Sequence, residues 1–204
     1  MTAPTPPAPL HGPAFGSYDS HEVAWLLSDL SGVELEAPTE EREEAIQSGG
    51  AHYAESLPVE YQPTPEYTEL FHDALRSSAS RLAHAVGVVT ELVLAERGDK
   101  AVLVSLARAG TPIGVLMRRW ASYAHGLVLP HYAVSIVRGR GIDQLALRYL
   151  AEHHRPEDVM FVDGWTGKGA ISRELAAAVA EANEALGLVE GFRADLAVLA
   201  DPGH

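Results

Sequence analysis

The sequence has 204 residues, of which 47% are hydrophobic and 21% are charged, so it can bury one core and a small appended lobe. It contains no cysteine, which excludes disulfides, thiolate metal sites and a cysteine nucleophile within these residues. The net charge of -13 argues against a nucleic-acid coat, because duplex binding requires a basic footprint. No apolar run approaches the roughly 20 residues of a membrane helix, and the N-terminus lacks a signal-peptide pattern. We therefore expect a soluble, cytoplasmic protein that contacts neither membrane nor nucleic acid.

The first half of the chain shows helical rather than strand patterns. Residues 1–14 are rich in proline and are expected to form a disordered lead-in. Apolar spacing predicts a short helix over residues 20–30, and the acidic run Glu40–Glu44 predicts an exposed helix. From residue 66 to residue 96, apolar residues recur every three or four positions, which indicates one long helix or two. We assign residues 15–98 to a mostly helical N-terminal hood.

After this segment the pattern changes to short β-rich runs that alternate with helical segments. Buried parallel strands are expected over residues 101–106, 132–137, 159–162 and 196–199. Helices are expected between them, over residues 112–123, 142–153 and 171–186. Because strand and helix alternate, the predicted class is α/β, a doubly wound parallel sheet with helices on both faces. This core spans residues 99–204.

The strongest candidate site is the stretch from Val159 to Ile171, which gives a strand, an acid, a glycine-rich loop and the start of a helix. In open parallel sheets, ligands bind beyond the carboxyl ends of the strands. Glycines let the backbone turn tightly and present N–H groups, and a helix start adds partial positive charge, so this loop can cradle a phosphate. Asp163 can accept hydrogen bonds from two vicinal sugar hydroxyls. The implied ligand is a sugar phosphate, and a glycine-rich turn without a ligand is the alternative.

Two further loops follow predicted strands and carry arginines. Arg108 lies among small residues beside Thr111, which can cap a helix, so this loop can clamp a diphosphate. Arg138 and Arg140 alternate with glycines, which indicates a mobile cationic loop able to close over a leaving anion. A surface arginine and a flexible surface loop are the respective alternatives. Nine Lys or Arg against five Asp or Glu over residues 108–173 suit a small polyanionic ligand, and ordinary surface charge is the alternative.

In this order, the three loops resemble the type I phosphoribosyltransferase fold, and the last is similar to that family's phosphoribosyl pyrophosphate motif. More closely, Ile46–Tyr53, Ser105–Gly114 and Phe161–Ile171 resemble a bacterial subgroup found in tellurium-resistance gene clusters, over residues 15–204. Some relatives in it are labelled cysteine protease StiP, a label that no cysteine here supports. Its members are often longer, with a Pelota-like RNA-binding region that these residues do not show. We expect a fragment or a short version.

The resemblance implies roles for individual residues. Asp163 would hold the ribose hydroxyls, and the loop from Thr166 to Ala170 would hold the 5-phosphate. The sequence departs from the family at Gly164, where a second acid is usual, and at Ala170, where a threonine is usual. The expected catalytic residues are Asp163, Arg138 and Arg140, with Arg138 to Asp143 as the mobile loop. The expected binding sets are Asp163, Gly164, Trp165, Thr166, Gly167, Lys168, Gly169 and Ala170 for phosphoribosyl pyrophosphate, and Ala107, Arg108, Ala109 and Gly110 for its pyrophosphate.

By this resemblance the chain is expected to be an enzyme, a phosphoribosyltransferase that moves ribose 5-phosphate from phosphoribosyl pyrophosphate to a base-like small molecule. The pathway would be linked to tellurium resistance or stress. Mg²⁺ would bridge the diphosphate and ribose oxygens, so we expect no metal held mainly by the protein. His52 and Tyr53 in the hood are candidates for the acceptor pocket, and a structural role is the favoured alternative.

Other functions compete with this expectation. One is a non-catalytic sensor or regulator that binds phosphoribosyl pyrophosphate or a nucleotide, and the missing second acid favours it. Another, the processing of peptides or RNA, has neither a nucleophile nor a basic stripe to support it. A homodimer is expected for both the transferase and the sensor, because the fold that the sequence resembles commonly dimerises.

Overall fold

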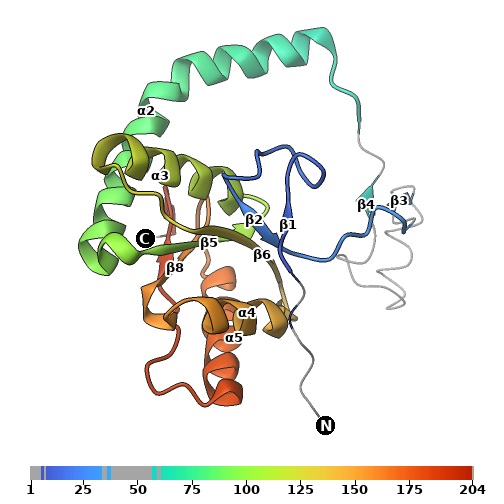
Figure 1. Ribbon diagram of the computed structural model, residues 1–204. Helices are drawn as coiled ribbons and strands as arrows, with labels where there is room; N and C mark the ends of the chain where they lie inside the picture. Colours follow the sequence, from blue (N-terminus) through green and yellow to red (C-terminus); the bar gives the residue numbers. More distant parts are fainter. Residues whose placement is uncertain (1–5, 7, 34–35, 38–56, 59–60, 204) are drawn as a thin grey trace. The chain divides into compact units, whose positions relative to one another are not determined.

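The computed structural model describes residues 6, 8–33, 36–37, 57–58 and 61–203 (Figure 1). The chain divides into two compact units, one of residues 1–27 with 81–204 and one of residues 28–80. In the second unit, β3 (Glu36–Ala37) pairs in parallel with β4 (Leu57–Pro58). Helix α2 (Pro65–Arg97) begins in the second unit and ends in the first. The first unit contains the sheet and the candidate site.

Within the described residues, seven strands form one mostly parallel sheet. Its strands are β1 (Leu10–His11), β2 (Ala24–Leu26), β5 (Val102–Ala107), β6 (His131–Val137), β7 (Gly141–Ile142), β8 (Val159–Val162) and β9 (Leu196–Ala197). The order is β1-β2-β6-β5-β8-β9, and β7 pairs with β6. Neighbours from β2 to β9 run parallel, whereas β1 is antiparallel to β2 and β7 is antiparallel to β6. The predicted α/β class with a mostly parallel sheet is confirmed.

Helices cover both faces of this sheet. In β5, Val104 and Leu106 pack in a cluster with α4 (Gln144–His153) and α5 (Ala170–Leu186), whereas Leu103 packs with α2 and α3 (Gly110–His125). Successive residues of a strand point to opposite faces, so a continuously apolar strand needs cover on both sides. Figure 1 shows α3 on one side of the sheet and α4 and α5 on the other.

The strand order places a change of winding direction between β5 and β8. From β5 the chain crosses over through α3 to β6 on one side, and after α4 it returns to β8 on the other side of β5. The connections that leave the carboxyl ends of β5 and β8 therefore diverge and leave a crevice, which is where open α/β sheets bind ligands. Two of the loops that the sequence singled out, after β5 and after β8, lie at this point.

The N-terminal segment differs from the expected helical hood. The helix predicted over residues 20–30 is wrong: Ala24–Leu26 form strand β2, which pairs with β6. Val23 and Leu26 follow helical spacing but are buried by the sheet, so tertiary pairing overrides the local pattern. Leu10–His11, in the segment expected to be disordered, form the edge strand β1. The exposed helix predicted from Glu40–Glu44 lies outside the described residues.

Helix α2 is one continuous helix, one of the two possibilities that the sequence left open. Gly87 is buried within it, and a Cβ there would lie 3.2 Å from the Trp120 ring of α3. An added Cβ would require the Trp120 ring to shift by a few tenths of an ångström. The helix does not need to break at Gly87, because the glycine serves close packing rather than a turn.

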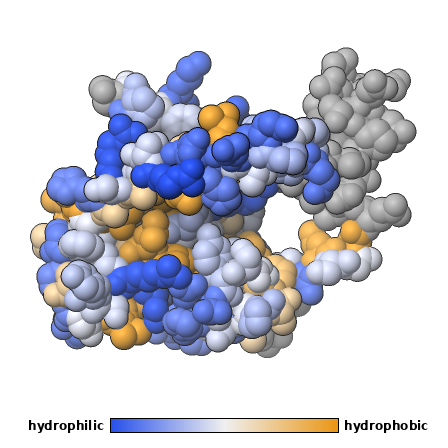
Figure 2. Space-filling view, turned by 90° about the horizontal axis from the view of Figure 1, so that it is seen from above, coloured by the Kyte–Doolittle hydropathy of each residue, from blue (hydrophilic) through white to orange (hydrophobic). Residues whose placement is uncertain are grey.

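The exposed surface carries polar residues with apolar residues among them. The face seen in Figure 2 is largely hydrophilic, with apolar patches. Exposed apolar side chains of the first unit include Val88, Leu92 and Tyr123, and α2 exposes Phe71 and Leu75 in the second unit. Scattered apolar residues of this kind are ordinary on protein surfaces. Among the described residues, no helix is both long enough and apolar enough to cross a membrane.

Candidate functional site

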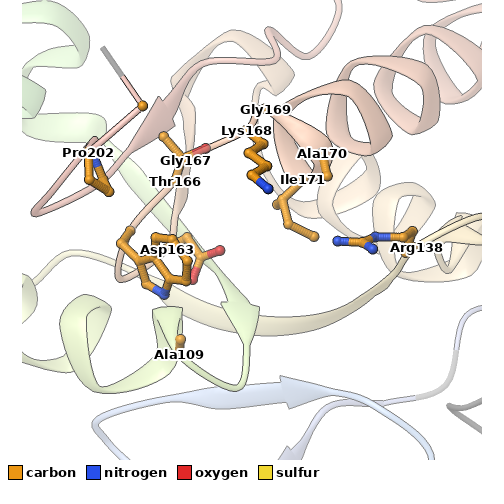
Figure 3. Close-up of a pocket in the computed structure, with 12 residues that line it drawn as sticks. Ala109, Arg138, Asp163, Thr166, Gly167, Lys168, Gly169, Ala170, Ile171 and Pro202 are labelled. Carbon is orange, nitrogen blue, oxygen red and sulfur yellow. The ribbon is translucent and has the colours of Figure 1, made fainter.

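A cavity of about 580 Å³ lies at the carboxyl end of the sheet in the first unit (Figure 3). Its walls come from the loops after β5, β6 and β8, from the start of α5 and from the chain beyond β9. The lining residues are Ala109, Arg138, Asp163, Trp165, Thr166, Gly167, Lys168, Gly169, Ala170, Ile171, Pro202 and Gly203. The structure thus brings together parts of all three loops that the sequence singled out.

The glycine-rich loop after β8 forms one wall and leads directly into α5. Gly169 has a φ of 71°, a left-handed conformation that favours glycine, and α5 begins at the next residue. The first turn of a helix leaves backbone N–H groups without partners inside the helix, and Ala170 and Ile171 of this turn line the cavity. The loop and the helix start therefore offer partial positive charge to a bound anion.

Asp163 stands where β8 ends and is half-buried in the cavity wall. Its backbone N–H donates to Ala197 O at 3.0 Å, and its Oδ1 accepts from Gly164 N at 2.7 Å. Burial raises the pKa of the Asp163 carboxyl, and the hydrogen bond from Gly164 opposes this rise. The carboxylate is held in place and can accept hydrogen bonds from ligand hydroxyls.

Two cationic side chains, from two different loops, line the cavity. Figure 3 shows the Lys168 ammonium pointing into it from the β8 loop and the Arg138 guanidinium extending toward the same space from the turn between β6 and β7. Two cations beside one carboxylate on an acidic chain favour a ligand with an anionic group and a polar neutral part. Arg140 lies in the same turn but is not among the lining residues. The segment predicted to be a mobile loop is a tight hairpin turn, in which Arg140 N donates to Val137 O at 2.9 Å.

The loop after β5 contributes less than expected. Ala109 lines the cavity, but Ala107, the exposed Arg108 and Gly110 do not, and the peptide bond between Ala107 and Arg108 is cis. A Cβ at Gly110 would lie 2.2 Å from Val162 O, so glycine lets the loops after β5 and β8 approach closely. The predicted capping role of Thr111 is wrong, because α3 already begins at Gly110 and Thr111 is buried inside its first turn.

Two residues that line the cavity were not predicted from the sequence, and two predicted site residues lie outside the part of the chain that the structure describes. Pro202 and Gly203 line the cavity because the chain beyond β9 runs beside the β8 loop, where Thr166 N donates to Ala200 O at 3.0 Å. No local motif marks these two residues, since the contact depends on a long-range pairing. His52 and Tyr53, the candidates for an acceptor pocket, lie outside the described residues, so their role stays a prediction.

A buried serine–histidine pair lies away from this cavity. His131 Nε2 and Ser105 Oγ are 2.8 Å apart, and His131 Nδ1 lies 2.8 Å from the carbonyl oxygen of Glu22. Ser105 is 0% exposed and His131 is 5% exposed, and burial lowers the pKa of His131 to about 4. A substrate cannot reach Ser105, so the pair links β5, β6 and the segment before β2 rather than forming a catalytic dyad.

Comparison with known proteins places this chain in a family. Residues 16–204 match the family described as tellurite-like stress resistance cysteine protease StiP. The chain belongs to the StiP family. A StiP relative, "Cysteine protease StiP" of Acinetobacter baylyi, is 42% identical over 160 residues, which are 78% of this chain and 41% of that protein. The chain therefore spans about two fifths of the length of this relative, and no solved structure matches it significantly.

The StiP names correct the function predicted from the sequence. They describe a cysteine protease, an enzyme of stress resistance, so the predicted phosphoribosyltransferase, a pentosyl-transferring glycosyltransferase, is wrong, as is the alternative of a non-catalytic sensor. The physical reason is that a strand, an acid, a glycine loop and a helix start form an anion cradle without specifying which bond is broken. The predicted link to tellurium resistance agrees with the family name.

The cysteine in the StiP name has no counterpart in this sequence. The 204 residues contain no cysteine, so a cysteine nucleophile is not among them. The cavity instead offers the carboxylate of Asp163, the ammonium of Lys168 and the hydroxyl of Thr166. These groups are suited to binding and orienting a ligand through charge and hydrogen bonds.

Proposed function

We propose that the cavity binds a small phosphorylated ligand, with its phosphate at the start of α5. The observation that carries the proposal is the convergence on one cavity of the loop 166–170, the first turn of α5, Lys168 and Arg138. Helix N-termini preceded by glycine loops bind phosphate through their N–H groups and dipole, and a lysine and an arginine add full positive charge. The position of this cavity at the change of winding direction supports the same conclusion.

Asp163 limits where the phosphate can lie and what the rest of the ligand is. A carboxylate repels a phosphate, so the phosphate belongs on the α5 side of the cavity and an uncharged polar group belongs beside Asp163. Two vicinal hydroxyls match the two oxygens of a carboxylate. A pentose phosphate such as ribose 5-phosphate carries both features at a separation suited to one small cavity.

The loop after β5 and a magnesium ion would contact a second phosphate group if the ligand carries one. Ala109 lines the cavity, so a second phosphate group of the ligand would extend toward this loop. Among the described residues, no three His, Asp or Glu side chains could together hold a metal ion. If Mg²⁺ accompanied such a ligand, Asp163 would be the protein group that holds it, and the ion would supply positive charge that offsets the charge of the phosphates.

The sheet order also supports a proposal about the fold. The parallel order β2-β6-β5-β8-β9, with the anion cradle after β8, is consistent with the type I phosphoribosyltransferase kind that the sequence resembles. A shared fold carries no statement about the reaction, because one fold serves many chemistries.

Calorimetric titration with ribose 5-phosphate, with and without Mg²⁺, tests the proposed ligand class. The control ligand is ribose, which lacks the phosphate. Lys168→Ala should weaken binding at least tenfold, since a hydrogen bond to a charged group contributes roughly 1.5–3 kcal/mol. Lys100→Ala is the matched control, because Lys100 is the other lysine in the sequence and does not line the cavity. Absence of binding, or equal affinity for ribose and ribose 5-phosphate, would overturn the proposal.

A further inference from the structure

We infer that Glu174 on α5 is a positioning residue that holds the turn between β6 and β7 against the cavity and so places Arg138 for ligand binding. The inference rests on the proposed function, because it assigns Arg138 to the ligand's anionic group. Glu174 does not line the cavity itself, so it acts through the turn.

The evidence is a contact between the turn and the helix. Gly139 N donates to Glu174 Oε1 at 2.8 Å, across 35 residues of sequence. Gly139 follows Arg138 at the tip of the turn and has a φ of 75°, which favours glycine. At its base the turn is fixed by the pairing of Val137 with Gly141. The Glu174 carboxylate therefore fixes the tip, and the backbone position of Arg138 depends on it.

A carboxylate at this place needs an explanation, because it works against an anion site. Glu174 is four residues after Ala170, and residues four apart lie on the same side of a helix. A negative charge one turn from the cavity repels a bound phosphate. A carboxylate near the N-terminus of α5 interacts favourably with the helix dipole, but this interaction does not explain the hydrogen bond from Gly139. A charge-assisted hydrogen bond to a backbone N–H does account for it.

The two possible roles of Glu174 predict effects of opposite sign. If Glu174 acted only through its charge, its removal would strengthen phosphate binding. If it positions Arg138, its removal weakens binding, because the turn loses its tie and Arg138 no longer stays at the cavity. Glu174→Gln separates the two roles, since the amide removes the charge but keeps an oxygen that can accept from Gly139.

Calorimetry with ribose 5-phosphate tests the inference on the whole chain. Glu174→Ala should weaken binding about fivefold, and Glu174→Gln should bind at least as tightly as wild type. In an Arg138→Ala background, Glu174→Ala should have no further effect, because coupled residues are non-additive. Glu184→Ala, an exposed glutamate farther along α5, is the matched control and should change nothing.

Amide hydrogen exchange provides a second measurement that needs no ligand. Exchange at Gly139 should be faster in Glu174→Ala than in wild type and should return toward the wild-type rate in Glu174→Gln. Unchanged exchange at Gly139 in Glu174→Ala overturns the inference. It is also overturned if Glu174→Ala binds ribose 5-phosphate as tightly as wild type or more tightly. The same holds if Glu174→Ala causes its full loss of affinity in the Arg138→Ala background. If wild type binds no ribose 5-phosphate, the proposed function fails, and the exchange rates still show whether Glu174 holds the turn.

Discussion

Lowering the pH should destabilise the fold through His131. Burial lowers the pKa of His131 to about 4 in the folded chain, against an ordinary value of 6.5. The unfolded chain therefore binds a proton between these two values that the folded chain does not bind, so stability is full above pH 6.5 and falls as the pH drops toward 4. A shift of this size removes about 2 kcal/mol between pH 7 and pH 5.

Urea denaturation of wild type and His131→Gln at several pH values measures this effect. The variant lacks the titrating ring, so its free energy of unfolding should lose about 2 kcal/mol less than wild type over the same range. His84→Gln, which removes an exposed histidine of α2, should follow the wild-type curve. If His131→Gln shows the same pH dependence as wild type, the buried neutral imidazole is refuted. The assignment of the Ser105–His131 pair as structural would then lose its electrostatic support.

Two further substitutions test the cavity itself. Asp163→Asn should weaken ribose 5-phosphate binding about tenfold, because a hydroxyl loses a charged acceptor, while inorganic phosphate should bind as well or better in calorimetry. A loss of affinity shared by both ligands would show that Asp163 does not recognise hydroxyls. Gly110→Ala should lower the free energy of unfolding by about 1–3 kcal/mol, since its Cβ would lie 2.2 Å from Val162 O. Gly32→Ala, where a Cβ meets nothing within 4 Å, should be close to neutral in thermal denaturation.

The core strands could be predicted because each carries its own signal. Val102, Leu103 and Val104 are all buried, and a short run that is apolar at every position and rich in β-branched residues fits a strand covered on both faces. Strand β2 carries no such signal: it has three residues, and its burial comes from pairing with β6 rather than from its own pattern. The two-residue strands β1 and β7 likewise exist only through their partners.

The residues of the candidate site differ in the same way: some are marked by the local sequence, and others reach the site only through long-range contacts. The residues from Asp163 to Ala170 line the cavity except Gly164, and their loop could be predicted because an acid at a strand end, glycines and a helix start are consecutive in the sequence. Gly203 and Glu174 could not, since each reaches the site through a contact between distant segments. Arg108 was predicted to bind a diphosphate because it is a cation at a strand end, but in the structure its side chain is exposed and does not line the cavity. Local sequence therefore predicts which groups are suited to an anion, and the tertiary structure decides which of them meet.

The family match narrows where the chemistry of this chain should be sought. The match covers residues 16–204, and this span contains no cysteine, so membership of the StiP family does not depend on a cysteine in this chain. What the span does contain is the parallel sheet and the cavity at the carboxyl ends of β5 and β8. The buried Ser105–His131 pair offers no accessible nucleophile in its place. The cavity that contains Asp163 and Lys168 is therefore the part of this chain on which experiments on its function should begin.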